Sequence, residues 1–437
     1  MKTYDEQVQS KAIGACIKNL LGGERLKKLI KCGKLFRASN ETTEQNMAIV
    51  IDGNKISDVL EISEVGDLGN YEVIDLSGKF VMPGLIDSHT HCWGNGSFKE
   101  LTVDSMYTIS PPTYALRGVK WVQDDLMAGF TTLRDAGAPG FADVAIRDAI
   151  NEGYHWGPRM MVAGLPLNAL GGHGDSPLQP PYSGKDRNNV RAIICGPDQA
   201  RQAARFNFKY GADFIKFMST YGVLTVGDDP GAQEMTYEEM RAIIEVAEFR
   251  GKTTATHAHG LNGIKCAIKA GVTSIEHGTF IDEETAEMMV GRGTFLVPTL
   301  LVHTRMFSKL GEGEIADYAI KKAKICESVQ FRNIKMAYDK GVKIALGTDV
   351  AAPYLYHGTQ AEELVLMVKK IGMKPEHALI SATKIGSELL KWDDKIGTIE
   401  RGKLADIIAV EGNPLNDMNV MKNVGFVMKD GTVYKNT

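Results

Sequence analysis

The sequence predicts an α/β protein: a closed parallel (β/α)8 TIM barrel with a small β-sandwich domain formed by both ends of the chain. The first observation is the steady alternation of strand-like and helix-like segments from residue 81 to about residue 392. The second is their number, because eight strand–helix units are what one barrel needs. The third is that polar side chains end several strands, and these ends share one face of a barrel.

The segments that flank the barrel are short and β-like. They cover residues 26–36, 46–51, 55–60 and 71–76, and β character returns at residues 396–410 and 424–434. We therefore expect one β-domain made of residues 26–80 and 393–437, with the barrel, residues 81–392, inserted between its halves. Residues 1–25 form an extension, within which residues 5–22 have the spacing of an amphipathic helix.

Each barrel strand is a short apolar run, and helical spacing follows it. After a first strand that ends at residue 91, strands are expected at residues 129–135, 160–165, 214–218, 253–257, 273–277, 295–299 and 343–347. Helices are expected at residues 141–151, 198–210, 237–250, 262–270, 282–290, 319–339 and 360–371. An open doubly wound sheet would also alternate, but it would normally carry a glycine-rich phosphate loop after its first strand, where this sequence has none.

Composition narrows the class of function. Of the 437 residues, 43% are hydrophobic and 24% charged, as in ordinary globular proteins. The net charge of −4 gives no reason to expect nucleic acid or an anionic membrane as a partner. The six cysteines are scattered without paired spacing, which is typical of reduced thiols in a cytoplasmic protein. We expect a cytoplasmic homo-oligomer that acts on a small molecule.

Polar residues at the strand ends predict a metal centre. His89 and His91 end the first strand one residue apart, so both rings lie on one face. Later strand ends supply further donors: Lys216, His257, His277 and Asp349. Histidines together with a carboxylate suit zinc or a similar divalent ion.

Lys216 is the unusual member of this set. It faces the same way as apolar neighbours, and a buried ammonium group is strongly disfavoured. A lowered pKa would leave a nucleophilic amine that can add carbon dioxide, and the carbamate so formed can bridge two metals. The alternative is an ordinary lysine paired with a carboxylate such as Asp213. Beside the other donors we favour the carbamate.

Several motifs then resemble those of a known family. They are PGLIDSHTH at residues 83–91, GGHGD at 171–175, GADFIK at 211–216, GDDPGAQ at 227–233, AHG at 258–260, IEHG at 275–278 and GTD at 347–349. Together they resemble the amidohydrolase superfamily, specifically its imidazolonepropionase-like branch, which includes Xaa-Pro and Xaa-Arg/Lys dipeptidases. The resemblance runs from about residue 30 to the C-terminus, and residues 227–233 favour the arginine/lysine-dipeptidase side.

The resemblance implies a site with two divalent metal ions per chain, expected to be Zn²⁺. It places His89, His91 and Asp349 on the more buried ion and His257 and His277 on the more exposed one. A CO2-derived carbamate on Lys216 is implied to bridge the two ions.

Substrate-facing residues are less well determined. His257 and His259 share a strand face, so spacing alone does not decide which one binds metal; the family places the metal on His257 and a substrate-facing group at the second position. We therefore expect His259 to polarise the substrate carbonyl. His173, in a glycine-rich loop, either faces the substrate or stabilises its turn. From position alone, Tyr221 and Arg134 are candidates to contact a substrate carboxylate.

The expected reaction is hydrolysis of an amide bond in a dipeptide or an N-acyl amino acid. Asp349 would accept a proton from water and pass it to the leaving nitrogen. Alternatives on the same scaffold are a cyclic-amide hydrolase, a lactonase or a deaminase, although Gly260 stands where related deaminases carry a catalytic glutamate. A non-catalytic scaffold is disfavoured because all six ligands are present.

Four further histidines lack motif context: His155, His303, His357 and His377. We expect His155 and His377 to be surface or packing residues. The position of His357 soon after Asp349 leaves open that it reaches the mouth of the barrel.

Overall fold

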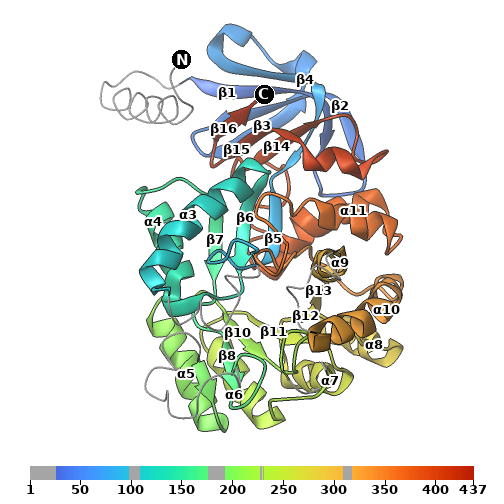
Figure 1. Cartoon of the computed structure of the whole chain (residues 1–437). Coiled ribbons are helices and arrows are strands. Elements are labelled where there is room, and N and C mark those ends of the chain that lie inside the picture. Colours follow the sequence, from blue (N-terminus) through green and yellow to red (C-terminus); the bar gives the residue numbers. More distant parts are fainter. Residues whose placement is uncertain (1–25, 98–108, 176–191, 227–228, 230, 309–316) are drawn as a thin grey trace.

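The computed structural model describes residues 26–97, 109–175, 192–226, 229, 231–308 and 317–437. The expected helix at residues 5–22 and part of the 227–233 motif lie outside these residues. The described chain forms a sheet built from both chain ends and a set of parallel strands surrounded by helices (Figure 1). None of the helices in these ranges combines the length and apolar character that a membrane crossing requires.

Both chain ends contribute to one seven-stranded sheet, in the order β16-β15-β14-β4-β1-β2-β3. The pair β1·β4 is parallel and the other pairs are antiparallel. Ile49, Ile407 and Phe426 share one buried apolar cluster within it. A β-sandwich arrangement and the domain boundaries remain predictions. The strands are β1 (Lys27–Phe36), β2 (Thr43–Asp52), β3 (Lys55–Glu61), β4 (Tyr71–Pro83), β14 (Ile407–Glu411), β15 (Val424–Lys429) and β16 (Thr432–Asn436).

The central strands form two parallel sheets. One has the order β5-β6-β7, and the other has the order β13-β12-β11-β10-β8-β9. The strands are β5 (Leu85–Thr90), β6 (Phe130–Asp135), β7 (Arg159–Val162), β8 (Leu167–Ala169), β9 (Ala192–Ile194), β10 (Ile215–Met218), β11 (Thr254–Ala258), β12 (Ser274–His277) and β13 (Phe295–Val297). The short strands β8 and β9 were not among the strands expected from the sequence.

Hydrogen bonds between these sheets make the arrangement TIM-barrel-like. The segment 343–350 forms parallel bridges to β13 at Ile344 and to β5 at Val350. On the other side, the backbone N–H of Asp213 donates to the carbonyl of Val162 at 2.7 Å. The expected eighth strand at residues 343–347 thus forms one isolated bridge, at Ile344, and not a ladder, so a closed eight-stranded barrel remains a prediction.

The alternation of side chains along the strands explains this layering. In β10, Ile215 and Phe217 belong to the main apolar cluster that packs with the helices. Phe214 belongs to a separate cluster with Ala255 and Val297, which also includes Ile86 of the other parallel sheet. Lys216 points to the same side as Phe214, because successive side chains of a strand face opposite ways. The space that Phe214 and Lys216 face is therefore apolar at the level of Phe214 and polar nearer the carboxyl ends of the strands.

Helices surround the parallel strands (Figure 1). Helix α6 begins at a capping box, in which the Thr236 hydroxyl accepts from the Glu239 N–H and the Glu239 carboxylate accepts from the Thr236 N–H. The helices are α3 (Pro111–Met127), α4 (Ala142–Asn151), α5 (Pro197–Lys209), α6 (Tyr237–Glu248), α7 (Leu261–Ala270), α8 (Glu283–Arg292), α9 (Leu300–Ser308), α10 (Asp317–Asp339), α11 (Glu362–Lys369), α12 (Pro375–Ile380) and α13 (Gly386–Leu389). Helices α3 and α9 were not expected from the sequence.

Candidate functional site

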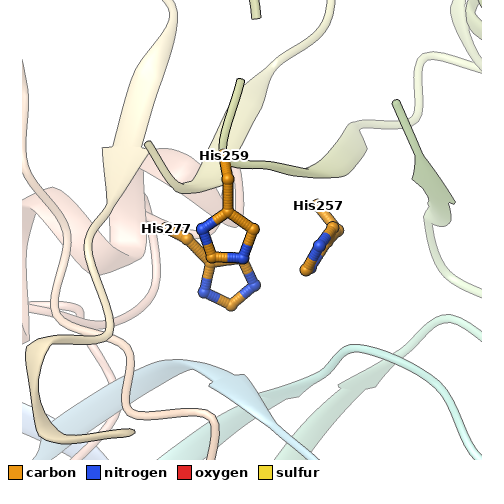
Figure 2. Close-up of side chains that lie close together, drawn as sticks. All are labelled: His257, His259 and His277. Carbon is orange, nitrogen blue, oxygen red and sulfur yellow. The ribbon is translucent and has the colours of Figure 1, made fainter. Parts of the chain in front are cut away.

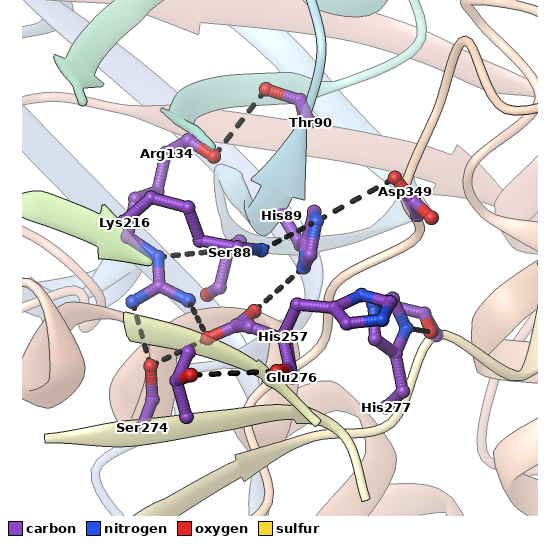
Figure 3. Close-up of polar contacts among 12 residues, drawn as sticks. Ser88, His89, Thr90, Arg134, Lys216, His257, Ser274, Glu276, His277 and Asp349 are labelled. Carbon is purple, nitrogen blue, oxygen red and sulfur yellow. Dashed lines mark hydrogen bonds and ion pairs between the residues drawn. The ribbon is translucent and has the colours of Figure 1, made fainter. Parts of the chain in front are cut away.

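The strand ends bring the predicted metal ligands together (Figure 3). Nε2 of His89 lies 3.3 Å from Nζ of Lys216 and 3.5 Å from Oδ1 of Asp349. Nε2 of His91 lies 3.3 Å from the same Asp349 oxygen. These donors come from β5, from β10 and from the end of segment 343–350, which lie far apart in the sequence.

Three more histidines complete the set. One ring nitrogen of each of His257, His259 and His277 lies within 4.8 Å of the other two, and Figure 2 shows the His257 ring edge-on beside the other two rings. The ring centroids of His257 and His277 are 4.6 Å apart, and the His259 ring stacks on the His277 ring at 4.9 Å. The structure therefore leaves both His257 and His259 within reach of one ion, as the sequence did.

Hydrogen bonds at Nδ1 fix the orientation of the histidine rings. Nδ1 of His89 donates to Glu276 at 2.7 Å, and Nδ1 of His91 donates to a backbone carbonyl at 2.9 Å. Nδ1 of His277 lies 2.7 Å from the hydroxyl of Thr299. The bonds at His89 and His91 leave Nε2 as the nitrogen with an available lone pair, which is the arrangement that metal-binding histidines show.

Arg134 has a structural role that the sequence did not reveal. Its side chain is 1% exposed and donates to the Ser88 carbonyl at 2.6 Å and to Glu276 at 2.7 Å. Although burial opposes ionisation, the Arg134 guanidinium and the His89 hydrogen bond hold the pKa of Glu276 well below its usual range. The expectation that Arg134 contacts a substrate carboxylate was wrong, because its guanidinium neutralises a buried protein carboxylate.

Lys216 has the surroundings of a reactive amine. It is 1% exposed, and burial lowers the pKa of its ammonium group to about 8. Asp213, the alternative partner, instead accepts a 2.7 Å hydrogen bond from Arg147. A pKa near 8 leaves an appreciable fraction of Lys216 as the neutral amine at physiological pH.

Two residues of the site adopt a backbone conformation that is unusual for side-chain-bearing residues. His277 has φ 70° and Asp349 has φ 59°, both in the left-handed region. The Asp349 N–H donates to the His89 carbonyl at 2.7 Å, which holds this turn against β5. Such conformations persist where the surrounding structure enforces them, and they are common at functional sites.

His257 offers an atom that fits a metal ion. Its Nε2 is buried and has no hydrogen-bond partner among the described residues. Gly222 lies beside it, and a Cβ added there would stand 3.0 Å from this nitrogen. Burial lowers the pKa of His257 well below its usual value, so the ring is neutral and keeps a lone pair. An unpaired buried nitrogen is costly unless a ligand engages it.

The loop with His173 lies against the same ring. The His173 ring stacks on His257 with a centroid distance of 4.2 Å. The backbone N–H of His173 donates to the Glu234 carboxylate at 2.6 Å, and Nδ1 of its ring lies 2.6 Å from the Thr225 hydroxyl. The Tyr221 hydroxyl donates to the Gly171 carbonyl of the same loop at 3.0 Å. His173 therefore lies beside the donors described above, and Tyr221 contacts the loop that carries it.

Comparison with known proteins identifies the family. The model of the Amidohydrolase family matches residues 80–434. The chain belongs to the amidohydrolase family. This amidohydrolase is 32% identical over 375 residues to a protein named ochratoxinase from Aspergillus niger, covering 81% of this chain and 75% of that protein. It is 24% identical over 372 residues to an imidazolonepropionase from Streptomyces avermitilis, covering 83% and 80% of the two chains.

A solved structure extends this similarity. The amidohydrolase superposes on a Xaa-Pro dipeptidase, crystallised with methionine in its active site, with a TM-score of 0.85 and 37% identity. The match covers 94% of this chain and all of that one (100%). The family and these relatives make the protein a hydrolase that acts on carbon–nitrogen bonds.

The remaining histidines of the amidohydrolase fall into three groups. His155 is exposed, and His377 contacts Tyr338 and Glu41 at the surface, as expected. His357 is held by Asp125 at 2.8 Å and by the Gly94 carbonyl at 3.0 Å, so both its nitrogens bond to the protein. His303 is buried beside His259, with 5.9 Å between ring centroids. Its sequence context gave no sign of this position.

Proposed function

We propose that this amidohydrolase uses two divalent metal ions to hydrolyse the amide bond of a small substrate, namely a dipeptide of the Xaa-Pro or Xaa-Arg/Lys kind or an N-acyl amino acid. The observation that carries the proposal is the Lys216 amine, buried 3.3 Å from Nε2 of His89 and next to two groups of metal-type donor atoms. The similarity to a Xaa-Pro dipeptidase supports this substrate class.

The residues fit a pair of ions, which we propose to be Zn²⁺. His89, His91 and Asp349 would hold one ion, since their donor atoms lie within 4.8 Å of one another. His257 and His277 would hold the other, and the unpaired Nε2 of His257 favours it over His259 as the ligand. Two such ions supply Lewis acidity: they lower the pKa of a water molecule toward neutrality and polarise a carbonyl oxygen.

Lys216 is proposed to bridge the ions after reaction with carbon dioxide. The neutral amine attacks the carbon of CO2, a nitrogen–carbon bond forms, and the proton from nitrogen passes to solvent. The product is a carbamate whose two oxygens carry the negative charge. This change replaces a cation by an anion among metal donors, and it removes the penalty of a buried ammonium group.

Three residues are proposed to act on the substrate. Asp349 takes a proton from the attacking water and delivers it to the leaving nitrogen, because an unprotonated amine is a poor leaving group. His259 donates a hydrogen bond to the developing oxyanion from Nε2, in the tautomer that places the proton there. His173 lies in the 171–175 loop with its ring on His257, and Tyr221 donates a hydrogen bond to the same loop. These two residues would orient the substrate beside His259.

A substrate panel tests the proposal. Purified protein should be assayed with Xaa-Pro, Xaa-Arg and Xaa-Lys dipeptides and with N-acyl amino acids, next to cyclic amides, lactones and aminated bases. Metal content should be measured on the same sample, so that inactivity is not confused with metal loss. Turnover of dipeptides or N-acyl amino acids above the other classes is expected. Turnover restricted to cyclic amides, lactones or deamination by the metal-loaded protein would contradict it.

A further inference from the structure

A second group of metal-type donors lies next to the proposed catalytic centre. One donor atom from each of His259, His303 and Cys326 lies within 4.8 Å of the other two. His259 follows β11, His303 lies in α9 and Cys326 lies in α10, so three separate elements deliver them to one point. Neither His303 nor Cys326 has a task in the proposed hydrolysis.

Hydrogen bonds at Nδ1 hold the rings of His303 and His259 in place. Nδ1 of His303 lies 2.7 Å from Oε1 of Gln330, and the Gln330 amide donates to the Pro298 carbonyl at 2.9 Å. Oε1 is therefore the acceptor and Nδ1 of His303 the donor, which leaves Nε2 with its lone pair. Nδ1 of His259 lies 2.8 Å from the Thr279 hydroxyl. The hydroxyl can accept from Nδ1 or donate to it, so Nε2 of His259 offers its lone pair to an ion in the tautomer that carries the proton on Nδ1.

Burial keeps the three side chains neutral when no ion is bound. Their residues are buried, and Cys326 packs in an apolar cluster with Val302 and Ala323. Burial raises the pKa of the Cys326 thiol to about 12 and lowers the pKa of His303 below its usual value. A bound cation would convert the thiol into a thiolate ligand and release one proton to solvent.

We propose that His259, His303 and Cys326 bind a third divalent cation of the zinc class, and that this cation withdraws His259 from the substrate. One thiolate and two imidazoles suit Zn²⁺ or Co²⁺, whereas Mg²⁺ and Ca²⁺ prefer oxygen ligands. Ligands of one tetrahedral zinc lie about 3.3–3.8 Å apart, so donors that lie within 4.8 Å of one another need to move closer by about 1 Å at most, with water as the fourth ligand. The withdrawal of His259 rests on the proposed function; the binding of the cation does not.

Cobalt tests the binding directly. Metal-free protein is titrated with Co²⁺ while the near-ultraviolet thiolate-to-cobalt charge-transfer band is recorded, and total cobalt is measured. The band should appear as the protein binds one equivalent of cobalt beyond those bound at the catalytic centre. It should disappear in Cys326→Ser and persist in Cys266→Ser, which removes a half-buried thiol on α7. No band in excess cobalt, or a band of equal intensity in Cys326→Ser, would overturn the site.

A second variant separates loss of the cation site from loss of the fold. His303→Gln keeps a polar side chain and leaves the thiol in place, so it should weaken the band's apparent cobalt affinity at least tenfold. Circular dichroism spectra of both variants should match the parent. An unchanged affinity in a folded His303→Gln protein would also count against the site.

Zinc inhibition tests the consequence for His259. Zinc added beyond the catalytic equivalents should inhibit amide hydrolysis, and Cys326→Ser should raise the half-inhibitory zinc concentration at least tenfold. Equal inhibition of both proteins would refute the withdrawal of His259. If no amide is hydrolysed, the proposed function fails, and the cobalt titration still decides the binding.

Discussion

Nδ1 of His89 donates a 2.7 Å hydrogen bond to Oε2 of Glu276, and both side chains are buried. The other carboxylate oxygen, Oε1, accepts hydrogen bonds from Arg134 at 2.7 Å and from Ser274 at 2.5 Å. Glu276 thus connects the buried side chains of Arg134 and Ser274 to the imidazole of His89 (Figure 3). This contact sets which nitrogen of His89 faces the proposed metal centre.

The first prediction concerns Glu276→Gln. The neutral amide cannot accept from both His89 and Arg134 as the carboxylate does, so His89 loses its orientation and basicity. Metal affinity should fall by about 10- to 100-fold, the usual effect of removing a partner that orients a metal ligand. A chelator-competition titration measures it. Glu248→Gln, at a surface carboxylate paired with Arg241, is the matched control and should leave affinity unchanged. Parental affinity in Glu276→Gln would show that the contact is only structural.

The second prediction concerns Lys216→Ala. Without the amine no carbamate forms, so metal content and amide hydrolysis should fall together. Added formate or acetate, supplied with metal, should restore part of the activity because a small carboxylate can replace the bridging anion. Lys265→Ala, at a lysine paired with Asp282, serves as the control. Full metal content and activity in Lys216→Ala would rule out the bridge.

The sequence predicted much of this fold because strand and helix periodicity is a local property. The spacing of His89 and His91 placed two donors at one strand end, and the predicted strands at 253–257 and 273–277 correspond to β11 and β12. Helix α3 was missed, and β8 and β9 were too short for their pattern to stand out. The 343–347 segment was predicted as a strand from its apolar run, but only one isolated bridge, at Ile344, forms there.

Within the site, the metal-type donors were predictable and their supporting contacts were not. Strand alternation puts Glu276 and His277 on opposite faces, yet both approach His89 because His277 adopts φ 70°. Asp and His adopt positive φ more often than most other residues, but the sequence does not indicate which of them do so. The burial of Arg134 and the approach of His303 to Cys326 likewise depend on how distant segments pack.

The third prediction separates the two roles proposed for Asp349. Asp349→Asn keeps an oxygen for the metal but cannot carry a proton to the leaving nitrogen. Hydrolysis of an amide should fall by about 100-fold or more relative to hydrolysis of the matching activated ester, whose leaving group needs no proton. The comparison requires preparations with equal metal content. Equal losses on both substrates would make Asp349 a ligand only.

The fourth prediction is a pH effect on stability at His357. Burial disfavours its charged form, but the nearby Asp125 carboxylate raises its pKa above the ordinary value of about 6.5. Because the folded pKa is the higher one, the stabilisation is complete below about pH 6.5 and is lost as pH rises through the folded value.

Thermal unfolding of metal-loaded protein between about pH 6 and pH 9 measures this effect. The melting temperature of the parent should fall more over this range than that of His357→Gln, which cannot be protonated. His377→Gln, at a histidine near the surface, is the control and should follow the parent. Parallel curves for the parent and His357→Gln would show that this pair does not contribute to the pH dependence.

The most direct test of the central claim is a titration of metal-free protein with zinc, in which amide hydrolysis and bound metal are measured on the same samples. The two-ion account predicts that activity rises until two equivalents are bound per chain, because the donors around Lys216 form one shared centre. Full activity at one bound equivalent, or in protein that holds none, would contradict it.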